Sequence, residues 1–196
     1  MRAFLLMVVL LLAGCPARQQ DPQPAYVGAE ISGAELGTDF TLQDHTGGVR
    51  HLSDFKGKLV ALFFGYTHCP DVCPTTLSDL AKALKLLGPD GDRVQVLFVT
   101  LDPERDTSEV LGRYVPSFNP LFIGLRGDEG TTRKVAQQFR IFYSKQASGS
   151  RSGYSIDHSA GVYVYDRKGN LRLYLSHGQG AKEIAHDFRV LLDRLE

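Results

Sequence analysis

Two cysteines, Cys69 and Cys73, lie close together in the segment 65–74, which reads GYTHCPDVCP. Both precede prolines, which biases their backbones away from the helical region. The three residues between them can fold as a tight turn, bringing the two Cα atoms within about 7 Å, the upper limit for a disulfide. The same proximity would let both thiolates reach one ion. The pair can therefore form a redox disulfide or bind a soft metal.

A strand and a helix are expected on either side of this pair. Residues 59–64 form a continuous apolar run, which is typical of a strand buried on both faces. Residues 74–87 carry apolar residues at helical spacing. Pro74 suits the first helical position, which places Cys73 near the N-cap. Because helix N-terminal amides stabilise a thiolate, we expect a lowered pKa at this position.

The spacing of the two cysteines limits the possible redox or metal-binding chemistry but does not identify it. Thioredoxin-like redox motifs have the spacing C-x-x-C, whereas this chain has C-x-x-x-C. Thiolates together with one imidazole suit Cu(I) and also Zn. A closed structural zinc site needs four protein ligands, and only three can be named here. An inert disulfide would stabilise little, because it closes a very short loop. A thiol peroxidase would need a positioned Thr and Arg, and that set is not convincing here.

The N-terminus predicts export and a lipid anchor. Arg2 precedes the apolar run 3–13, which is shorter than the about 20 residues that a membrane-spanning helix needs. Such a segment is typical of a secretory signal. Residues 12–15, LAGC, resemble the bacterial lipobox, in which cleavage precedes the lipid-bearing cysteine. We therefore expect a signal peptide at 1–14, lipid on Cys15, and a domain on the extracytoplasmic (periplasmic) side of the membrane, where the pair can persist as a disulfide.

The remaining chain divides into a tether and one domain. Residues 15–36, rich in Pro and Gln, suit a flexible tether, and residues 37–196 form the domain. Its alternating strands and helices predict an α/β fold, with a central mixed sheet flanked by helices and an N-terminal hairpin at 40–52. The expected strands are 59–64, 94–101, 121–125, 161–165 and 171–175; the expected helices are 74–87, 107–115, 131–142 and 181–195; and 144–156 is expected to be an exposed insertion.

The charge balance argues against a nucleic-acid partner. Basic and acidic residues number 22 each in a chain of 196 residues, so no overall field would attract nucleic acid. The length fits one domain plus an N-terminal extension. Neither observation identifies a partner.

Three segments together resemble one family. They are 65–77, GYTHCPDVCPTTL; 99–107, VTLDPERDT; and 157–159, DHS. In order and spacing they are similar to the SCO/SenC family, and the resemblance runs from about Phe40 to the C-terminus. It implies a thioredoxin-like fold that binds Cu(I) or Cu(II) through Cys69, Cys73 and His158.

The resemblance also implies a role. A metallochaperone of this kind assembles the copper centre of cytochrome c oxidase, with the oxidase's copper-binding subunit or another copper chaperone as its partner. The alternative is an exported thiol-disulfide reductase that keeps the target cysteines reduced. Thioredoxins carry a cis-proline opposite their cysteines, but this chain has no proline after Pro120, which weakens the reading as a general oxidoreductase.

Other polar residues near the motif are weaker ligand candidates. His68 adjoins Cys69, but neighbouring side chains usually diverge, so we expect an outer or surface role. Asp71 is a hard oxygen donor and a poor match for Cu(I). Asp102 follows a strand, where a structural role is expected.

Overall fold

The computed structural model describes residues 25–37, 39–147 and 153–193. The predicted signal peptide and Cys15 lie outside these ranges. A central sheet has the strand order β1-β10-β9-β4-β5-β6-β2-β3, and β7 and β8 form a separate two-stranded sheet. The strands are β1 (Ala29–Glu30), β2 (Thr41–Asp44), β3 (Val49–His51), β4 (Leu59–Gly65), β5 (Val94–Thr100), β6 (Ile123–Arg126), β7 (Tyr143–Ala147), β8 (Tyr154–His158), β9 (Gly161–Tyr165) and β10 (Leu171–Ser176).

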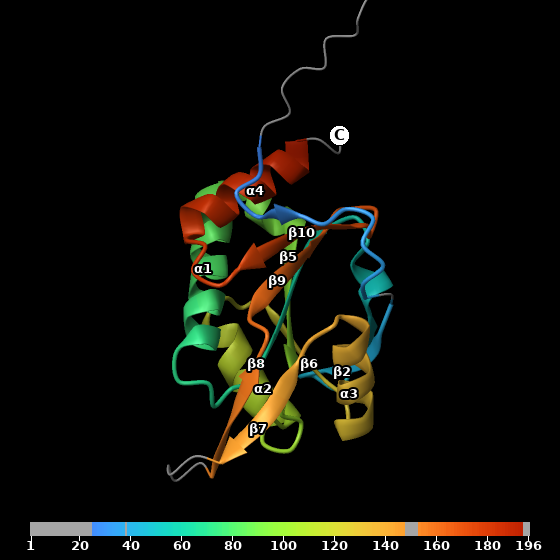
Figure 1. Ribbon diagram of the computed structural model, residues 1–196. Coiled ribbons are helices and arrows are strands. Elements are labelled where there is room, and N and C mark those ends of the chain that lie inside the picture. The colour runs from blue at the N-terminus through green and yellow to red at the C-terminus, as the bar shows by residue number, and fades with distance from the viewer. Residues whose placement is uncertain (1–24, 38, 148–152, 194–196) are drawn as a thin grey trace, which may run out of the picture.

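Helices cover both faces of the central sheet (Figure 1). They are α1 (Val72–Leu87), α2 (Ser108–Tyr114), α3 (Glu129–Gln138) and α4 (Ala181–Asp193), with short 3-10 turns at Leu52–Phe55, Gly88–Arg93 and Val115–Ser117. The helices α1 and α4 pack against each other on one face, and α3 lies on the other. This arrangement confirms the predicted mixed sheet flanked by helices. The predicted N-terminal hairpin is also present, as antiparallel β2 and β3.

The buried strand β4 divides the core into two halves. Leu59, Ala61 and Phe63 belong to the cluster that includes α1 and α4, whereas the intervening residues belong to the cluster that includes α3. This alternation follows from the period-two geometry of a strand. Strands β4 and β5 are parallel, and Gly65 pairs with Thr100 at their carboxyl ends. Both chain segments that follow these strands therefore emerge at the same edge of the sheet.

The first helix begins earlier than expected. It starts at Val72 rather than at Pro74, so Cys73 lies within its first turn. A proline is tolerated there because the first amides of a helix have no partner within the helix. The N-cap residue is Asp71.

The third helix ends at Gln138, four residues before the predicted end at 142. Arg140 has φ of +52°, in the left-handed region. The Ile141 amide donates to the Ala136 carbonyl at 2.8 Å, and the Arg140 amide donates to the Gln137 carbonyl at 3.0 Å. These bonds form a left-handed C-cap, which glycine usually provides. Because arginine occupies that position, the sequence carried no stop signal.

The predicted exposed insertion at 144–156 is instead mostly part of an antiparallel hairpin. Its strands β7 and β8 pair from Tyr143 with His158 to Ala147 with Tyr154. The Ile156 side chain is buried, which ties the hairpin to the main core. Figure 1 shows the hairpin extending from the end of the molecule opposite α4.

The domain begins before residue 37, so part of the predicted tether belongs to the sheet. Strand β1 pairs with β10. The buried Asp187 carboxylate accepts the amides of Val27 and Gly28, each at 2.8 Å. A two-residue strand is too short to show a period in the sequence, and its partner lies far along the chain. Within the described ranges, none of the helices is both long enough and apolar enough to cross a lipid bilayer.

Candidate metal centre

The two cysteines meet at the start of α1, just beyond the end of β4. Cys73 is fully buried, Cys69 is partly exposed, and both are free thiols. The Cys69 amide donates to the Tyr66 carbonyl at 3.3 Å, which closes a turn after the strand. A Cβ added at Gly65 would lie 2.7 Å from Cys73 Sγ. The glycine therefore leaves the room that the buried sulfur occupies.

The pKa values of the two cysteines are shifted in opposite directions. Cys69 Sγ accepts the Cys73 backbone amide at 3.4 Å. A hydrogen bond from the Cys73 side chain lowers the pKa of Cys69, and the backbone amides at the start of the helix lower it further. The same hydrogen bond, together with burial, raises the pKa of Cys73. The lowered pKa that the helix start predicted for Cys73 is therefore found at Cys69 instead, and the pKa of the buried Cys73 is raised.

The third predicted ligand, His158, lies beside the sulfurs at the end of β8. Its Nε2 is 3.8 Å from Cys73 Sγ. Its Nδ1 is 3.0 Å from the Ser159 carbonyl oxygen, which can only accept a hydrogen bond. Nδ1 therefore carries the proton, and the lone pair of Nε2 faces the cysteines. A fixed tautomer of this kind is what a metal-binding imidazole requires.

The distance between two of the three candidate ligands suits a shared metal ion. With bonds of about 2.3 Å to sulfur and about 2.0 Å to nitrogen, two ligands at an angle of about 110° to 120° lie about 3.5 to 3.7 Å apart. The observed separation of 3.8 Å between Cys73 Sγ and His158 Nε2 is close to this range. Two thiolates and an imidazole are soft and borderline donors, which suit copper. In the described part of the chain, no group of three or more His, Cys, Asp and Glu side chains lies close enough together to hold a metal ion without some movement.

A polar clamp attaches the hairpin that carries His158 to the main sheet. Arg105 forms an ion pair with Asp102 and donates to the Tyr154 carbonyl oxygen at 2.9 Å. The Arg105 guanidinium also stacks on the Tyr154 ring, with its carbon 3.6 Å from the ring centroid. The Tyr154 hydroxyl donates to Asp102 at 2.8 Å. These contacts fix the first residue of β8, and His158 is the last.

An aromatic contact completes the support of the imidazole. The rings of Tyr66 and His158 meet edge to face, with their centroids 6.0 Å apart. The Arg105 guanidinium lies 5.8 Å from the centroid of the Tyr66 ring. Tyr66, Arg105 and Tyr154 were given no individual role from the sequence. The DPERD segment was part of the family resemblance, but its contact with a residue 49 positions away has no local signal.

The residue His68 turns away from the sulfurs, as expected. Its Nδ1 lies 3.2 Å from Thr67 Oγ1 and 3.9 Å from the buried Asp106 carboxylate, and its side chain is 44% exposed. Asp106 also accepts from Thr67 and from Thr100, each hydroxyl at 2.6 Å. This carboxylate ties the cysteine loop to the end of β5. Asp71 is exposed and bonds Thr75 instead.

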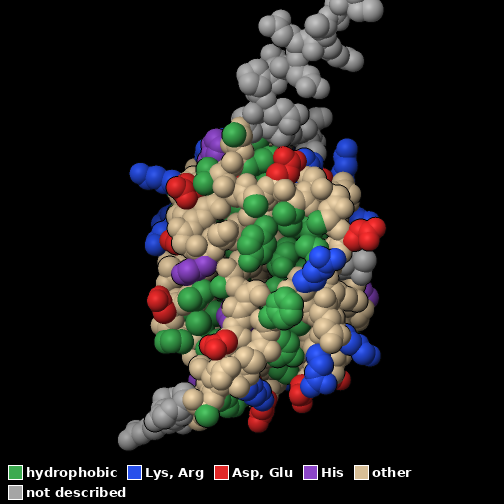
Figure 2. All heavy atoms as spheres, in the orientation of Figure 1, with side chains coloured by type: hydrophobic (Ala, Val, Ile, Leu, Met, Phe, Trp, Pro, Cys, Tyr) green, Lys and Arg blue, Asp and Glu red, His purple; other side chains and the backbone are tan. Residues whose placement is uncertain are grey.

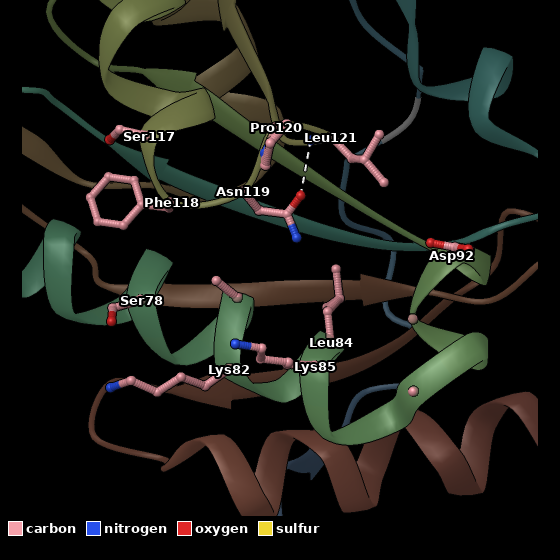
Figure 3. A pocket seen from close by; sticks show the side chains of 13 residues that line it. Ser78, Lys82, Leu84, Lys85, Asp92, Ser117, Phe118, Asn119, Pro120 and Leu121 are labelled. Carbon is pink, nitrogen blue, oxygen red and sulfur yellow. Dashed lines mark hydrogen bonds between the residues drawn. The ribbon is translucent and has the colours of Figure 1, made fainter.

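A well-formed hollow lies away from the cysteines. It has a volume of about 520 Å³ and lies between α1 and the loop 117–121. Figure 3 shows Lys82 and Lys85 on one side and Asn119 on the other, with Asn119 bonded to the Leu121 amide. The lysines lie in the C-terminal half of α1, whereas the cysteines lie at its N-terminal end. This hollow is therefore separate from the candidate metal centre.

The fold and site define a thioredoxin-like domain that presents a cysteine pair and a histidine at one edge of its sheet. The SCO1/SenC family profile matches residues 28–193. The chain belongs to the SCO1/SenC family.

Relatives of known structure or name agree with this assignment. The SCO2 homologue of cattle mitochondria is 39% identical over 153 residues, which is 77% of this chain and 58% of the relative. The copper-bound structure of Bradyrhizobium japonicum ScoI is 36% identical, with a TM-score of 0.73 over 80% of this chain and 99% of that one. The apo Sco1 of Thermus thermophilus is 40% identical, with a TM-score of 0.70 over 86% and 95%. The chain spans less than two thirds of the length of the mitochondrial SCO2 relatives.

Proposed function

We propose that the chain binds one copper ion, as Cu(I) or Cu(II), through Cys69, Cys73 and His158. The observation that supports this most directly is the 3.8 Å approach of His158 Nε2 to Cys73 Sγ. Cys69 belongs to the same cluster, because its sulfur accepts the backbone amide of Cys73 at 3.4 Å. A relative with 36% identity was solved with copper bound.

The proposed role is that of a metallochaperone for the copper centre of cytochrome c oxidase. Its partner would be the copper-binding subunit of the oxidase or another copper chaperone. Family membership supports this role. So does the partial exposure of Cys69, because an incoming cysteine from a partner can approach a ligand that is not buried. Copper would be the cargo of such a protein rather than a permanent cofactor.

A second candidate function, thiol-disulfide reduction, rests on the asymmetry of the two thiols. The partly exposed Cys69 has the lowered pKa, and the buried Cys73 has the raised one. An acidic, accessible thiolate is suited to attack a disulfide of another protein. Cys73 could then displace the mixed disulfide, leaving Cys69 and Cys73 oxidised and the target reduced.

The proposed location is the extracytoplasmic (periplasmic) side of a bacterial membrane, with a lipid on Cys15 as the anchor. The support is the LAGC segment at 12–15, after a short apolar run. The described chain begins beside α4, where the Ala25 carbonyl lies 3.2 Å from His186 Nε2. The hairpin that carries His158 lies at the other end of the molecule (Figure 1).

Metal analysis of the full-length protein tests the copper site. The protein is reduced anaerobically and offered copper and zinc together. We expect one copper per chain in the wild type, and no tight copper in the variant with Cys69→Ala and Cys73→Ala. The matched control is His68→Ala, which changes the histidine beside the loop and should leave the stoichiometry unchanged. One tightly bound copper in the double variant would place the site elsewhere.

Copper transfer separates the two candidate functions. The copper-loaded protein is mixed with the copper-free oxidase subunit, whose cysteines are either reduced beforehand or oxidised. A metallochaperone delivers copper to the reduced subunit. A reductase instead converts the oxidised subunit to thiols in the absence of copper and itself ends as the disulfide.

A further inference from the structure

An exposed aromatic residue stands directly beside the hairpin that carries His158. Phe142 is 81% exposed, the highest value among the exposed large hydrophobic residues of the described chain. The left-handed Arg140 turns the chain so that Ile141 is buried while Phe142 faces outward. A non-glycine residue in that conformation is strained, and such strain persists where the surrounding structure enforces it. The outward aromatic side chain is thus a fixed feature of this surface.

This aromatic residue borders a groove with an excess of positive charge. The groove, of about 600 Å³, lies between α3 and β7, and its charged lining residues are Glu129, Arg133, Arg140 and Lys145. Arg133 pairs with Glu129 at 2.8 Å and Lys145 pairs with Glu104 at 2.7 Å, so the excess charge of the groove lies at Arg140. No ion pair joins Arg140 to another residue of the described chain. Figure 2 shows hydrophobic side chains gathered on this face, with both basic and acidic side chains around them.

Hydrogen bonds connect Phe142, at the edge of the groove, to the residue next to His158. The Phe142 carbonyl accepts the Ser159 amide at 3.0 Å, and the Ser159 hydroxyl faces the Phe142 amide at 3.4 Å. The next residue, Tyr143, pairs with His158. A partner seated against Phe142 would therefore bear on the strand pair that holds the imidazole.

We propose that the groove around Phe142 docks an acidic segment with one apolar side chain, presented by the protein that exchanges copper with this chain. This inference rests on the proposed metallochaperone function. Phe142 would bury against the apolar side chain, and Arg140 would meet a carboxylate. Aromatic and arginine side chains are the residues that most often dominate binding energy at protein interfaces.

Charge and position select this occupant over two others. A second copy related by a two-fold axis would bring equivalent patches together and set Arg140 against its own equivalent, which like-charge repulsion opposes. An anionic membrane would suit the charges, but the described chain enters the domain beside α4, at the end opposite the hairpin (Figure 1). A protein partner can approach that distal end freely.

The test compares Phe142→Ser and Arg140→Glu with two matched controls on other surfaces. Leu121→Ser removes an apolar side chain that is 58% exposed, and Arg113→Glu reverses a cation whose side chain is 73% exposed. The copper-binding subunit of cytochrome c oxidase is the probe. Binding to each full-length variant is measured by titration calorimetry, and copper transfer by stopped flow. Copper affinity and melting temperature are recorded for every variant first.

We expect each groove variant to weaken association and slow transfer by about tenfold, with copper affinity unchanged. The controls should behave as the wild type, and Arg140→Glu should flatten the salt dependence of association. Groove variants that bind and transfer like the controls would overturn the docking site but leave the metallochaperone function standing. If the subunit bound at the groove but received no copper, the docking site would stand and the metallochaperone function would be overturned. A dimer that Phe142→Ser dissolves, or anionic vesicles that bind through Phe142 while the subunit does not, would replace the proposed occupant.

Discussion

The hydroxyl of Tyr154 offers a way to loosen His158 without touching any proposed ligand. Tyr154→Phe removes the 2.8 Å hydrogen bond to Asp102 and keeps the ring on which Arg105 stacks. A hydrogen bond to a charged group contributes about 1.5 to 3 kcal/mol. The hairpin is partly exposed, so we expect the lower end of that range to apply.

The loss of this hydrogen bond sets an upper limit on the change in copper affinity. The hairpin must be docked for His158 to coordinate, so the apparent affinity falls with the docked fraction. A loss of about 1.4 kcal/mol corresponds to about tenfold in an equilibrium constant. We therefore expect the variant to bind Cu(II) up to about tenfold more weakly. Cu(I) binding should change little, because two thiolates alone can hold that ion.

The assay is a titration followed through the absorption band that arises from thiolate-to-Cu(II) charge transfer, with Cu(I) affinity measured by competition against a chelator. Tyr163→Phe is the matched control, because it removes a 2.8 Å hydrogen bond to the Phe139 carbonyl on the other side of the sheet. That control should lower the melting temperature without moving the band. Equal losses of Cu(I) and Cu(II) affinity in Tyr154→Phe, or an unchanged Cu(II) affinity and spectrum, would refute the clamp as a positioning element.

Three further perturbations test other parts of the reasoning. Gly65→Ala would put a methyl group 2.7 Å from Cys73 Sγ, so we expect the free energy of unfolding to fall by about 1 to 3 kcal/mol, as measured by calorimetry. Chelator competition should show weaker binding of copper in both oxidation states. Burial works against ionisation of Asp44, but the hydrogen bonds of its turn hold its pKa below the ordinary value. Its stabilisation is therefore fully present above about pH 4 and is lost progressively as the pH falls toward the lowered pKa of the folded state. Asp44→Asn should lower the melting temperature at pH 7, and this difference from the wild type should shrink steadily as the pH is lowered below about 4. Cys15→Ser should leave the precursor uncleaved or release the protein from membranes, and mass spectrometry of an unmodified chain beginning elsewhere in the wild type would argue against the anchor.

The strands and helices that position the cysteines could be predicted because burial imposes a period on their sequences. Every residue of β4 is buried, and the sequence shows an unbroken apolar run there. Helix α1 buries one stripe, and its apolar residues recur at helical spacing. The loop between these two elements then follows from chain continuity. The position of the cysteine pair at the edge of the sheet was therefore accessible from local patterns.

The hairpin that carries His158 could not be predicted in the same way. Strand β7 is almost entirely exposed, so its residues show no alternation of polar and apolar types. Its conformation depends on pairing with β8 rather than on burial. The end of α3 was missed for a related reason, because Arg140 adopts a conformation that is typical of glycine. Only the family resemblance pointed to His158 as a ligand.

The proposed site therefore combines ligands from two elements of very different rigidity. Cys69 and Cys73 lie at the junction of a fully buried strand and the first turn of a helix. His158 lies on a two-stranded hairpin held by the Arg105 clamp and one buried isoleucine. Segments with few buried contacts open at lower free energy than the core. A partner that displaces the hairpin would thus remove the imidazole while leaving the thiolates in place, which would favour Cu(I) over Cu(II) at the moment of transfer. The mobility of the third ligand, rather than that of the thiolates, would then control when copper leaves.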